Sequence, residues 1–358
     1  MAHYSDLCVS LLIASSLAFL PLFASSTASG QVKGISVPPG FRVEVVAEGF
    51  ALPSAVAVGP GGAFGFDLYI GDWINSTVER LSVSASTRTV IAAGITNPGA
   101  LAFGPPGLFP SGLYTINADG DVIIIDAMGG QQVLARVPTP FGRDMAFDTS
   151  GDFGGDLYVM DTAGGLPPFG DKILRVSPTG TASLFTMAPR MPEENAWGIA
   201  FGLGRFGTDL YVSFGGSALI GSPIPSIYRI NRTGDGSAFA VYPEFHELMD
   251  IAFSPGGSFG EYLYVGELTN NTIYRLTPAG DLEAFARGFN FGSQISADLA
   301  FGRDGSLYVA EGGMGRLLRI VVPGQGSSTG VLLVFLGIIA VAAVAPLAFV
   351  LIRARRKK

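Results

Sequence analysis

Three aspartates occupy the same place in a recurring sequence pattern. Asp144, Asp250 and Asp298 each stand directly before a short segment that ends in Ala-Phe, in separate parts of the chain. Carboxylate oxygens that converge from different segments suit Ca²⁺ far better than Zn²⁺. We therefore take these residues as candidate metal ligands and Ca²⁺ as the candidate cofactor. A purely structural role at the start of a strand is the alternative.

A histidine lies close to one of these aspartates. His246 is the only histidine outside the first 30 residues, and it stands four residues before Asp250. An imidazole titrates near neutral pH and can serve as a general base. His246 and Asp250 are therefore the candidate catalytic residues, although a lone histidine also fits a structural role. Arg143 and Asn195 stand shortly before two of the other repeated segments.

A second set of polar residues follows a repeated Leu-Tyr pair, three positions after the tyrosine. Its members are Asp72, Asn117, Asp161, Glu267 and Glu311. Because an acid recurs at this place in four of the repeats, we favour a turn-stabilising role over a chemical one.

Composition excludes several kinds of site. The only cysteine is Cys8, so a disulfide framework, a zinc site built on cysteines and a cysteine nucleophile are excluded. The formal net charge is −7 at pH 7, and five of the basic residues are gathered at the C-terminus. A nucleic-acid partner needs a basic surface. We therefore expect no binding of nucleic acid.

The elements that position these residues repeat along the chain. The tyrosines of the Leu-Tyr pairs are 45, 44, 53, 53 and 44 residues apart. They are Tyr69, Tyr114, Tyr158, Tyr211, Tyr264 and Tyr308. One short apolar segment precedes each Leu-Tyr pair and another follows it. A looser fourth segment completes five of the six repeats. Such apolar segments between Gly, Pro and Asp turns are typical of strands. Four strands in each of six repeats predict an all-β fold, a six-bladed β-propeller over residues 41–323.

The two ends of this repeated region complete each other. The sixth repeat ends after three strands, whereas residues 41–50 read as a strand with no repeat of its own. Its end, residues 47–50, matches residues 286–289 at the end of the fourth strand of repeat five. We therefore predict that the N-terminal strand closes the last blade.

The first 30 residues have the pattern of a secretory signal peptide. Residues 7–24 form an apolar run, and residues 28–30 have the small-x-small form that a signal peptidase needs. No basic residue precedes the run, so an uncleaved anchor is the alternative. Residues 31–40 then form an N-terminal lead into the propeller.

The C-terminal end is typical of a membrane anchor. Residues 330–352 carry no charged side chain, and a helix of this length spans about 34 Å. A Gly/Ser linker at 324–329 precedes this segment. The basic tail at 353–358 is expected in the cytoplasm. A sorting tag that an enzyme removes is the alternative.

These ends predict a single-pass protein of the cell membrane, anchored by its C-terminal helix, with the propeller outside the cytoplasm. Three Asn-x-Ser/Thr sequons are then glycosylation candidates, provided that the host glycosylates exported proteins. They begin at Asn75, Asn231 and Asn270.

The repeats resemble a known superfamily of propellers. Innermost segments end in Ala-Phe, and a Gly-rich turn leads to Leu-Tyr-Val-x-Asp/Glu, as residues 302–311 show best. This pattern resembles the NHL-repeat and the SMP-30, gluconolactonase and strictosidine-synthase-like six-bladed β-propellers. Residues 38–45 also resemble the opening of sorbosone or glucose dehydrogenase-like propellers. The resemblance covers residues 38–323 and implies that ligands bind on the face where the innermost strands begin.

This superfamily includes binding platforms, lactonases, synthases and quinoprotein dehydrogenases, so the resemblance does not specify the chemistry. Our main hypothesis is a membrane-anchored extracellular platform for an unknown ligand or protein, because no nucleophile–base pair is visible. The alternative is a divalent-metal-dependent hydrolase of the lactonase type that uses the three aspartates. A second alternative, based on residues 38–45 alone, is a quinoprotein that resembles sugar or aldehyde dehydrogenases.

Overall fold

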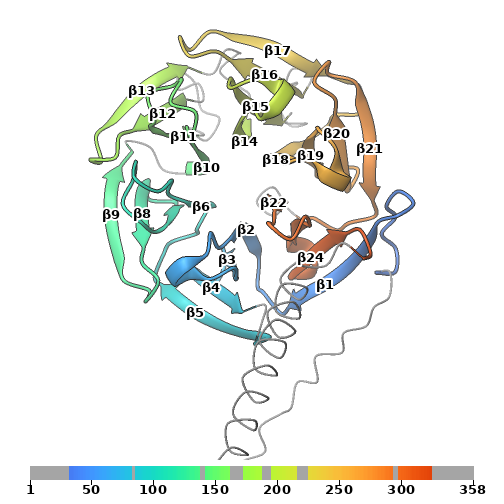
Figure 1. Cartoon of the computed structure of the whole chain (residues 1–358), viewed down its shortest axis with the longest axis horizontal. Helices are drawn as coiled ribbons and strands as arrows, with labels where there is room; N and C mark the ends of the chain where they lie inside the picture. Colours follow the sequence, from blue (N-terminus) through green and yellow to red (C-terminus); the bar gives the residue numbers. More distant parts are fainter. Residues whose placement is uncertain are drawn as a thin grey trace, which may run out of the picture.

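Six four-stranded antiparallel sheets surround a central axis (Figure 1). The computed structural model describes residues 32–82, 85–137, 142–161, 172–187, 195–215, 225–292 and 297–324. The prediction of an all-β, six-bladed propeller is confirmed.

The segments predicted as signal peptide (1–30), membrane helix (330–352) and basic tail (353–358) lie outside the described residues. All of the 324–329 linker except its first residue also lies outside them. Within the described part of the chain, no helix is long and apolar enough to cross a membrane.

Each blade is one sheet, and the blades are numbered along the chain. Blade one contains β2 (Pro53–Val58), β3 (Leu68–Asp72), β4 (Thr77–Ser82) and β5 (Thr87–Ala93), and blade two contains β6 (Ala100–Phe103), β7 (Leu113–Ile116), β8 (Asp121–Ile125) and β9 (Gln131–Arg136). Blade three contains β10 (Gly142–Phe147), β11 (Leu157–Asp161), β12 (Lys172–Val176) and β13 (Ala182–Met187), and blade four contains β14 (Asn195–Phe201), β15 (Leu210–Gly215), β16 (Ser226–Ile230) and β17 (Gly236–Val241). Blade five contains β18 (Leu248–Phe253), β19 (Leu263–Glu267), β20 (Thr272–Leu276) and β21 (Leu282–Arg287), and blade six contains β22 (Leu299–Phe301), β23 (Leu307–Glu311), β24 (Arg316–Val321) and β1 (Arg42–Glu48). Single turns of 3₁₀ helix occur at η1 (Gly62–Phe64), η2 (Gly204–Phe206), η3 (Gly257–Phe259) and η4 (Gly312–Met314).

The N-terminal strand closes the ring, as predicted. β1 pairs antiparallel with β24, with Val43 opposite Ile320 and Glu44 opposite Arg319. Val43 is fully buried, and Glu44 forms an ion pair with Arg319. The chain before this strand also docks, because Ser36 forms a β-bridge with Arg287 at the edge of blade five. The N-terminal lead therefore holds the fifth blade as well as the sixth.

The repeated tyrosine joins neighbouring blades. In blade four, the Tyr211 hydroxyl donates a hydrogen bond to the Phe206 carbonyl at 3.0 Å, and its ring packs edge-on against Phe253 of blade five at 5.1 Å between centroids. Equivalent Tyr–Phe contacts link blades one to two, two to three, three to four and five to six. The Leu-Tyr and Ala-Phe patterns thus recur because they meet at blade junctions.

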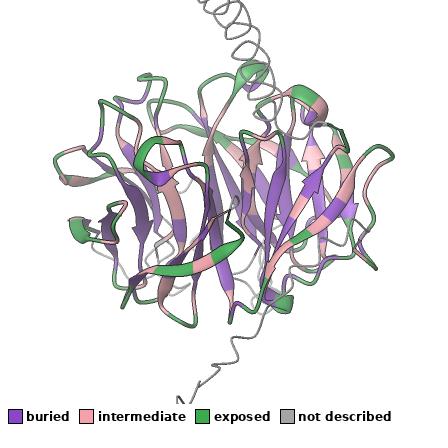
Figure 2. Cartoon of the chain, turned by 60° about the horizontal axis from the view of Figure 1, so that its bottom comes forward, coloured by how far each residue is buried: buried purple, intermediate pink, exposed green. Residues whose placement is uncertain are grey.

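Burial is greatest in the inner part of each blade and lowest in its outer strand (Figure 2). The second strands β3, β11, β19 and β23 are buried along their whole length, whereas the outer strand β5 is mostly exposed or partly exposed. The looser apolar pattern of the fourth segment follows from this exposure, because only one face of an outer strand meets the core.

Candidate functional site

Irregular strand pairing marks the start of the innermost strands. The register shifts between Pro53 and Ala55 in β2, between Gly142 and Met145 in β10, between Ala196 and Gly198 in β14, and between Leu248 and Ile251 in β18. Such bulges re-aim side chains and are common beside active sites. The residues at these shifts are Ser54, Arg143, Asp144, Trp197, Met249 and Asp250.

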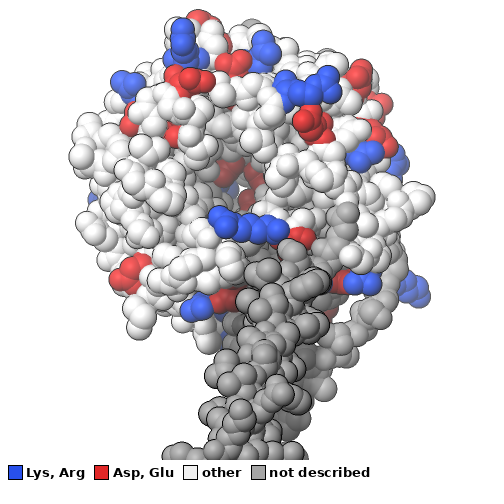
Figure 3. Space-filling model, in the orientation of Figure 1, with Lys and Arg blue, Asp and Glu red and all other residues white. Residues whose placement is uncertain are grey.

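All of these residues line one pocket on the central axis. The pocket has a cavity volume of about 30 Å³, which is room for a few water molecules or a small ion. It is lined by Ser54, Trp73, Gly99, Arg143, Asp144, Trp197, Met249, Asp250, Ala297 and Asp298. Figure 3 shows acidic side chains inside the central opening.

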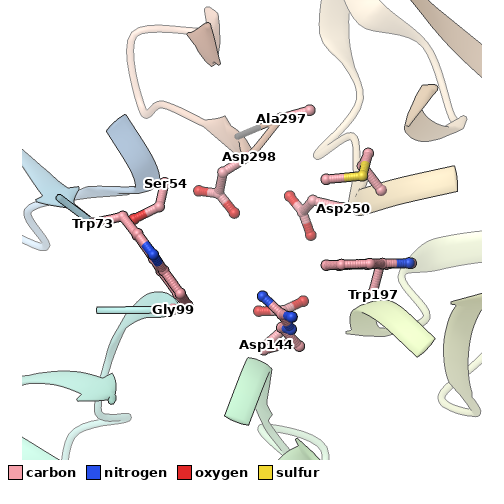
Figure 4. Close-up of a pocket in the computed structure, with 10 residues that line it drawn as sticks. Ser54, Trp73, Gly99, Asp144, Trp197, Asp250, Ala297 and Asp298 are labelled. Atoms are coloured by element: carbon pink, nitrogen blue, oxygen red, sulfur yellow. The ribbon is translucent and has the colours of Figure 1, made fainter. Parts of the chain in front are cut away.

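The structure brings the three predicted aspartates together from blades three, five and six. In Figure 4, Asp250 and Asp298 lie beside each other, and Asp144 lies across the pocket from them. Trp73 and Trp197 flank the space between these groups.

The side chain of each aspartate also forms a hydrogen bond across a junction between two blades. Oδ2 of Asp144 accepts the Ile199 N–H of blade four at 2.7 Å. In the same way, Asp250 accepts the Leu299 N–H of blade six at 2.8 Å. Asp298 accepts the Val56 N–H of blade one at 2.5 Å. These side chains therefore have the structural role that was the alternative, and they line the pocket as well.

The protein environment favours the protonated form of all three carboxyl groups. Each residue is partly buried, and its carboxyl group is desolvated within the ring of strands. Burial raises the pKa of Asp144 to about 6. Burial and then the charge of Asp144 raise the pKa of Asp298 to about 8. Burial, followed by the charges of Asp298 and Asp144, raises the pKa of Asp250 well above its ordinary value.

The ligand atoms of this pocket suit a metal ion, but their present positions do not. Carboxyl oxygens are ligands for a hard cation such as Ca²⁺, and like charges that face one another favour a cation between them. Oδ2 of each aspartate is already used in a backbone hydrogen bond, and Oδ1 of Asp144 also accepts the Met145 N–H at 2.7 Å. Among the described residues, no three His, Cys, Asp or Glu side chains are grouped to hold one ion. Binding would therefore require the carboxyl groups to move closer together.

The predicted catalytic pair is separated. Asp250 lines the pocket, whereas His246 is exposed and does not line it. Its Nδ1 lies 3.0 Å from the Glu244 carbonyl oxygen and 3.2 Å from Nδ2 of Asn270. The side chain of Asn195 lies outside the described part of the structure.

The acids after the Leu-Tyr pairs hold turns. Asp72 is buried and accepts the Ala51 and Leu52 N–H groups, which lead into β2. Glu267 accepts the Glu247 N–H just before β18, and Glu311 accepts the Asn290 N–H in the segment that follows β21. Asn117 accepts two N–H groups within its own turn. These contacts favour the turn-stabilising role. The sequon residues Asn75, Asn231 and Asn270 are exposed.

One lining position recurs in each blade, and of its residues the sequence reasoning named only Arg143. The residue directly before the aspartate position lines the pocket in all six blades, and we call it the mouth position. The six mouth residues are Ser54, Gly99, Arg143, Trp197, Met249 and Ala297. Aligning the repeats on Ala-Phe would have identified them. Trp73 is the tenth lining residue, and it directly follows Asp72 in the sequence.

Comparison with known proteins supports the fold. No protein-family model matches the chain, and no curated protein is similar to it in sequence. The structure is similar to a gluconolactonase from Xanthomonas campestris, with a TM-score of 0.60 at 14% identity over 79% of this chain and 90% of that one. The calcium-binding protein regucalcin from Agrobacterium tumefaciens gives 0.57 at 15% identity over 79% and 94%. An auxiliary nutrient binding protein from Bacteroides ovatus gives 0.57 at 13% identity over 80% and 76%. The chain thus has the six-bladed architecture of SMP-30, gluconolactonase and regucalcin-like propellers, as the sequence pattern implied.

Proposed function

We propose that this protein hydrolyses a lactone at the central pocket. The observation that carries the proposal is the convergence of Asp144, Asp250 and Asp298 on one pocket, where the pKa of Asp144 is about 6 and that of Asp298 is about 8. Carboxyl groups with separated pKa values are suited to act as base and acid in one reaction. The similarity in fold to a gluconolactonase supports this choice, and it replaces the binding platform as our main hypothesis.

Two of the aspartates would divide the proton transfers. At pH 7, a pKa of about 6 leaves Asp144 mostly ionised, so it can accept a proton from a water molecule as that water attacks the lactone carbonyl carbon. Asp298, with a pKa of about 8, is mostly protonated. It can give its proton to the ring oxygen as the ring C–O bond breaks. The new bond joins the water oxygen to the carbonyl carbon, and the proton returns from Asp144 to Asp298 through solvent.

A divalent cation would replace the protons of these carboxyl groups, because proton and cation compete for the same oxygens. If the three carboxyl groups moved closer together, they would hold the ion, and the ion would polarise the carbonyl group of the substrate. The tight cavity of about 30 Å³ would admit only the reacting carbonyl group, with the rest of the substrate outside on the face where the innermost strands begin.

The test is hydrolysis of a panel of uncharged γ- and δ-lactones. The rate is measured as the acid released at constant pH, with and without Ca²⁺. Asp144→Asn and Asp298→Asn should each lower kcat by about a hundredfold or more. Asp281→Asn is the matched control, because Asp281 is exposed in the β20–β21 hairpin. Turnover that persists in both pocket variants would exclude this site. Saturable lactone binding without turnover would return the protein to the binding-platform hypothesis.

A further inference from the structure

The two tryptophans of the chain face each other across the pocket. Trp73 follows β3 of blade one, and Trp197 occupies the bulge in β14 of blade four. They are the only tryptophans in the 358 residues. Figure 4 shows their indole rings on opposite sides of the cavity. Two blades that are far apart in the sequence therefore supply the aromatic walls of one site.

The strands around Trp197 lack side chains where its ring lies. A Cβ atom on Gly215 would lie 2.7 Å from two atoms of the Trp197 ring. A Cβ atom on Gly198 would lie 2.8 Å from the Asp250 Cα atom, so a side chain at that position would push blades four and five apart. Trp197 is only 7% exposed. Gly215 is thus needed for the indole to occupy this place beside the cavity, and Gly198 is needed for the close approach of blades four and five.

The guanidinium group of Arg143 lies between these rings. It is 4.6 Å from the centroid of Trp197 and 5.7 Å from that of Trp73. Both distances are within the range of cation–π attraction. Flat guanidinium groups stack well on aromatic faces, and their N–H groups point outward in the plane of the group. Contacts from two sides fix a long side chain that would otherwise have many rotamers.

We propose that Trp73 and Trp197 are positioning residues, which hold the Arg143 guanidinium as a hydrogen-bond donor to the carbonyl oxygen of an uncharged cyclic ester. The inference rests on the proposed lactone hydrolysis and names the class of substrate. It adds a cationic donor to the acid–base pair, at the place where negative charge develops on the carbonyl oxygen.

The charges of the pocket select the same class of ligand. One arginine and three carboxyl groups line a single small cavity. An organic cation would be repelled by Arg143. The carboxylate formed by ring opening would be repelled by the Asp144 carboxylate. An uncharged carbonyl compound has neither conflict, and its hydrolysis product is held less well than the substrate.

The test uses δ-valerolactam, which has the shape of a δ-lactone but resists hydrolysis, and the intrinsic fluorescence of the full-length protein. Because both tryptophans line the pocket, the signal reports on this site alone. Lactam should cause a saturable change, whereas 5-hydroxypentanoate should bind at least about tenfold more weakly. Arg143→Gln and Trp197→Leu should each weaken lactam binding about tenfold or more, a loss of the size of one desolvated cation–π or charged hydrogen bond.

Trp197→Phe is the conservative variant, because it retains an aromatic face for the guanidinium group. It should restore lactam affinity to within about threefold of wild type, with Trp73 as the remaining fluorophore. Thermal melting followed by circular dichroism shows whether the Trp197→Leu variant is folded. A second pair of variants, Trp73→Leu and Trp73→Phe, repeats the comparison at the less buried ring. Equal lactam affinity in wild type, Arg143→Gln and the leucine variants would overturn the inference, as would tight binding of 5-hydroxypentanoate.

The two proposals fail separately. Lactam binding that depends on Arg143, without turnover of any lactone, would remove the proposed hydrolysis and leave the uncharged carbonyl site. Turnover that is insensitive to Arg143→Gln would retain the hydrolysis and remove the positioned arginine.

Discussion

Two adjacent positions in each repeat determine the chemistry of the pocket. The mouth position presents a hydroxyl, a guanidinium, an indole, a thioether or almost nothing, depending on the blade. The aspartate position carries an acid in blades three, five and six only. The tyrosines at the blade junctions, by contrast, are the same in all six repeats. Packing therefore keeps the repeat uniform where blades meet, and the pocket is where the repeats differ.

The raised pKa values predict a pH-dependent stability in protein freed of metal ions with EDTA. Unfolded aspartate has a pKa of about 4, whereas Asp144 and Asp298 have values of about 6 and about 8 in the folded protein. Between these limits the folded state holds more protons than the unfolded state, so stability falls as pH rises. The free energy of unfolding should be lower at pH 8 than at pH 5 by a few kcal/mol, in order of magnitude.

Urea unfolding at pH 4, 5, 6 and 8 measures this slope. Asp298→Asn keeps an oxygen that can accept the Val56 N–H and removes the titrating group. The variant should be more stable than wild type at pH 8 and should show no such gain at pH 4. If the unfolding free energies of wild type and Asp298→Asn changed in parallel with pH, ionisation of this carboxyl group would not destabilise the folded protein, which would contradict the prediction.

Added Ca²⁺ should raise the melting temperature of the wild-type protein, because a ligand that binds the folded state stabilises it according to its free concentration over its dissociation constant. The gain should be larger at pH 8 than at pH 5, because proton and cation compete for the same carboxyl groups. Asp250→Asn should remove most of the gain, and Asp281→Asn should leave it intact. An equal Ca²⁺ effect in wild type and Asp250→Asn would place the ion elsewhere.

Strand pairing determines which residues enter the pocket. A regular strand alternates its side chains between two faces, so two adjacent residues such as Arg143 and Asp144 would normally point apart. The register shift between Gly142 and Met145 removes this alternation, and both side chains line the cavity. The same reasoning explains Met249 and Asp250 in β18.

The closing strand offers a comparison within one element. Val43 is fully buried against blade six, whereas Val45, which the sequence pattern places on the same face, is 41% exposed. Val45 is the last residue before the register shift between Val45 and Ala47, whereas Val43 lies within the regular pairing. Val43→Ala should therefore cost about 2 kcal/mol of unfolding free energy, and Val45→Ala should cost about 0.5 kcal/mol or less. Chemical denaturation measures both, and equal losses would contradict the structure at this strand.

At the scale of the whole molecule, the ring has one junction unlike the other five. Blade six meets blade one without the Tyr–Phe pair, because Val58 stands where the other inner strands have phenylalanine. Tyr308 packs in one core cluster with Val58 partly buried against it, and its hydroxyl donates to Asp304. The hydrogen bond from the Val56 N–H to Asp298 crosses this junction, and the β1–β24 pairing completes blade six beside it. Ring closure and the pocket therefore share a residue.

The composition of the chain ends predicts the location of this ring. Residues 1–30 and 330–352 have the patterns of a signal peptide and a membrane span, and residues 353–358 are basic. A protease added to intact cells should therefore remove the propeller and leave a C-terminal epitope tag cell-associated. A tag placed after residue 31 is the control for the removed part. A propeller that is protected in intact cells and cleaved after lysis would contradict this topology.

Local patterns in the sequence were sufficient to predict the blades, their number and the closing strand. Alternating apolar residues, Gly-rich turns and a tyrosine at nearly constant spacing are properties of short segments, so they can be read before the chain is folded. The three aspartates could be identified for the same reason, since each holds a fixed place before Ala-Phe.

Only the tertiary structure decided which side chains meet. A shift of one residue in strand pairing turns a side chain to the other face, and the pairing depends on hydrogen bonds between strands. Hence Trp197 and Arg143 enter the pocket, while His246, only four residues from Asp250, remains outside it. The pairing of Trp73 with Trp197 could not be read from the sequence, because it joins blades one and four across a cavity that exists only when the ring is closed.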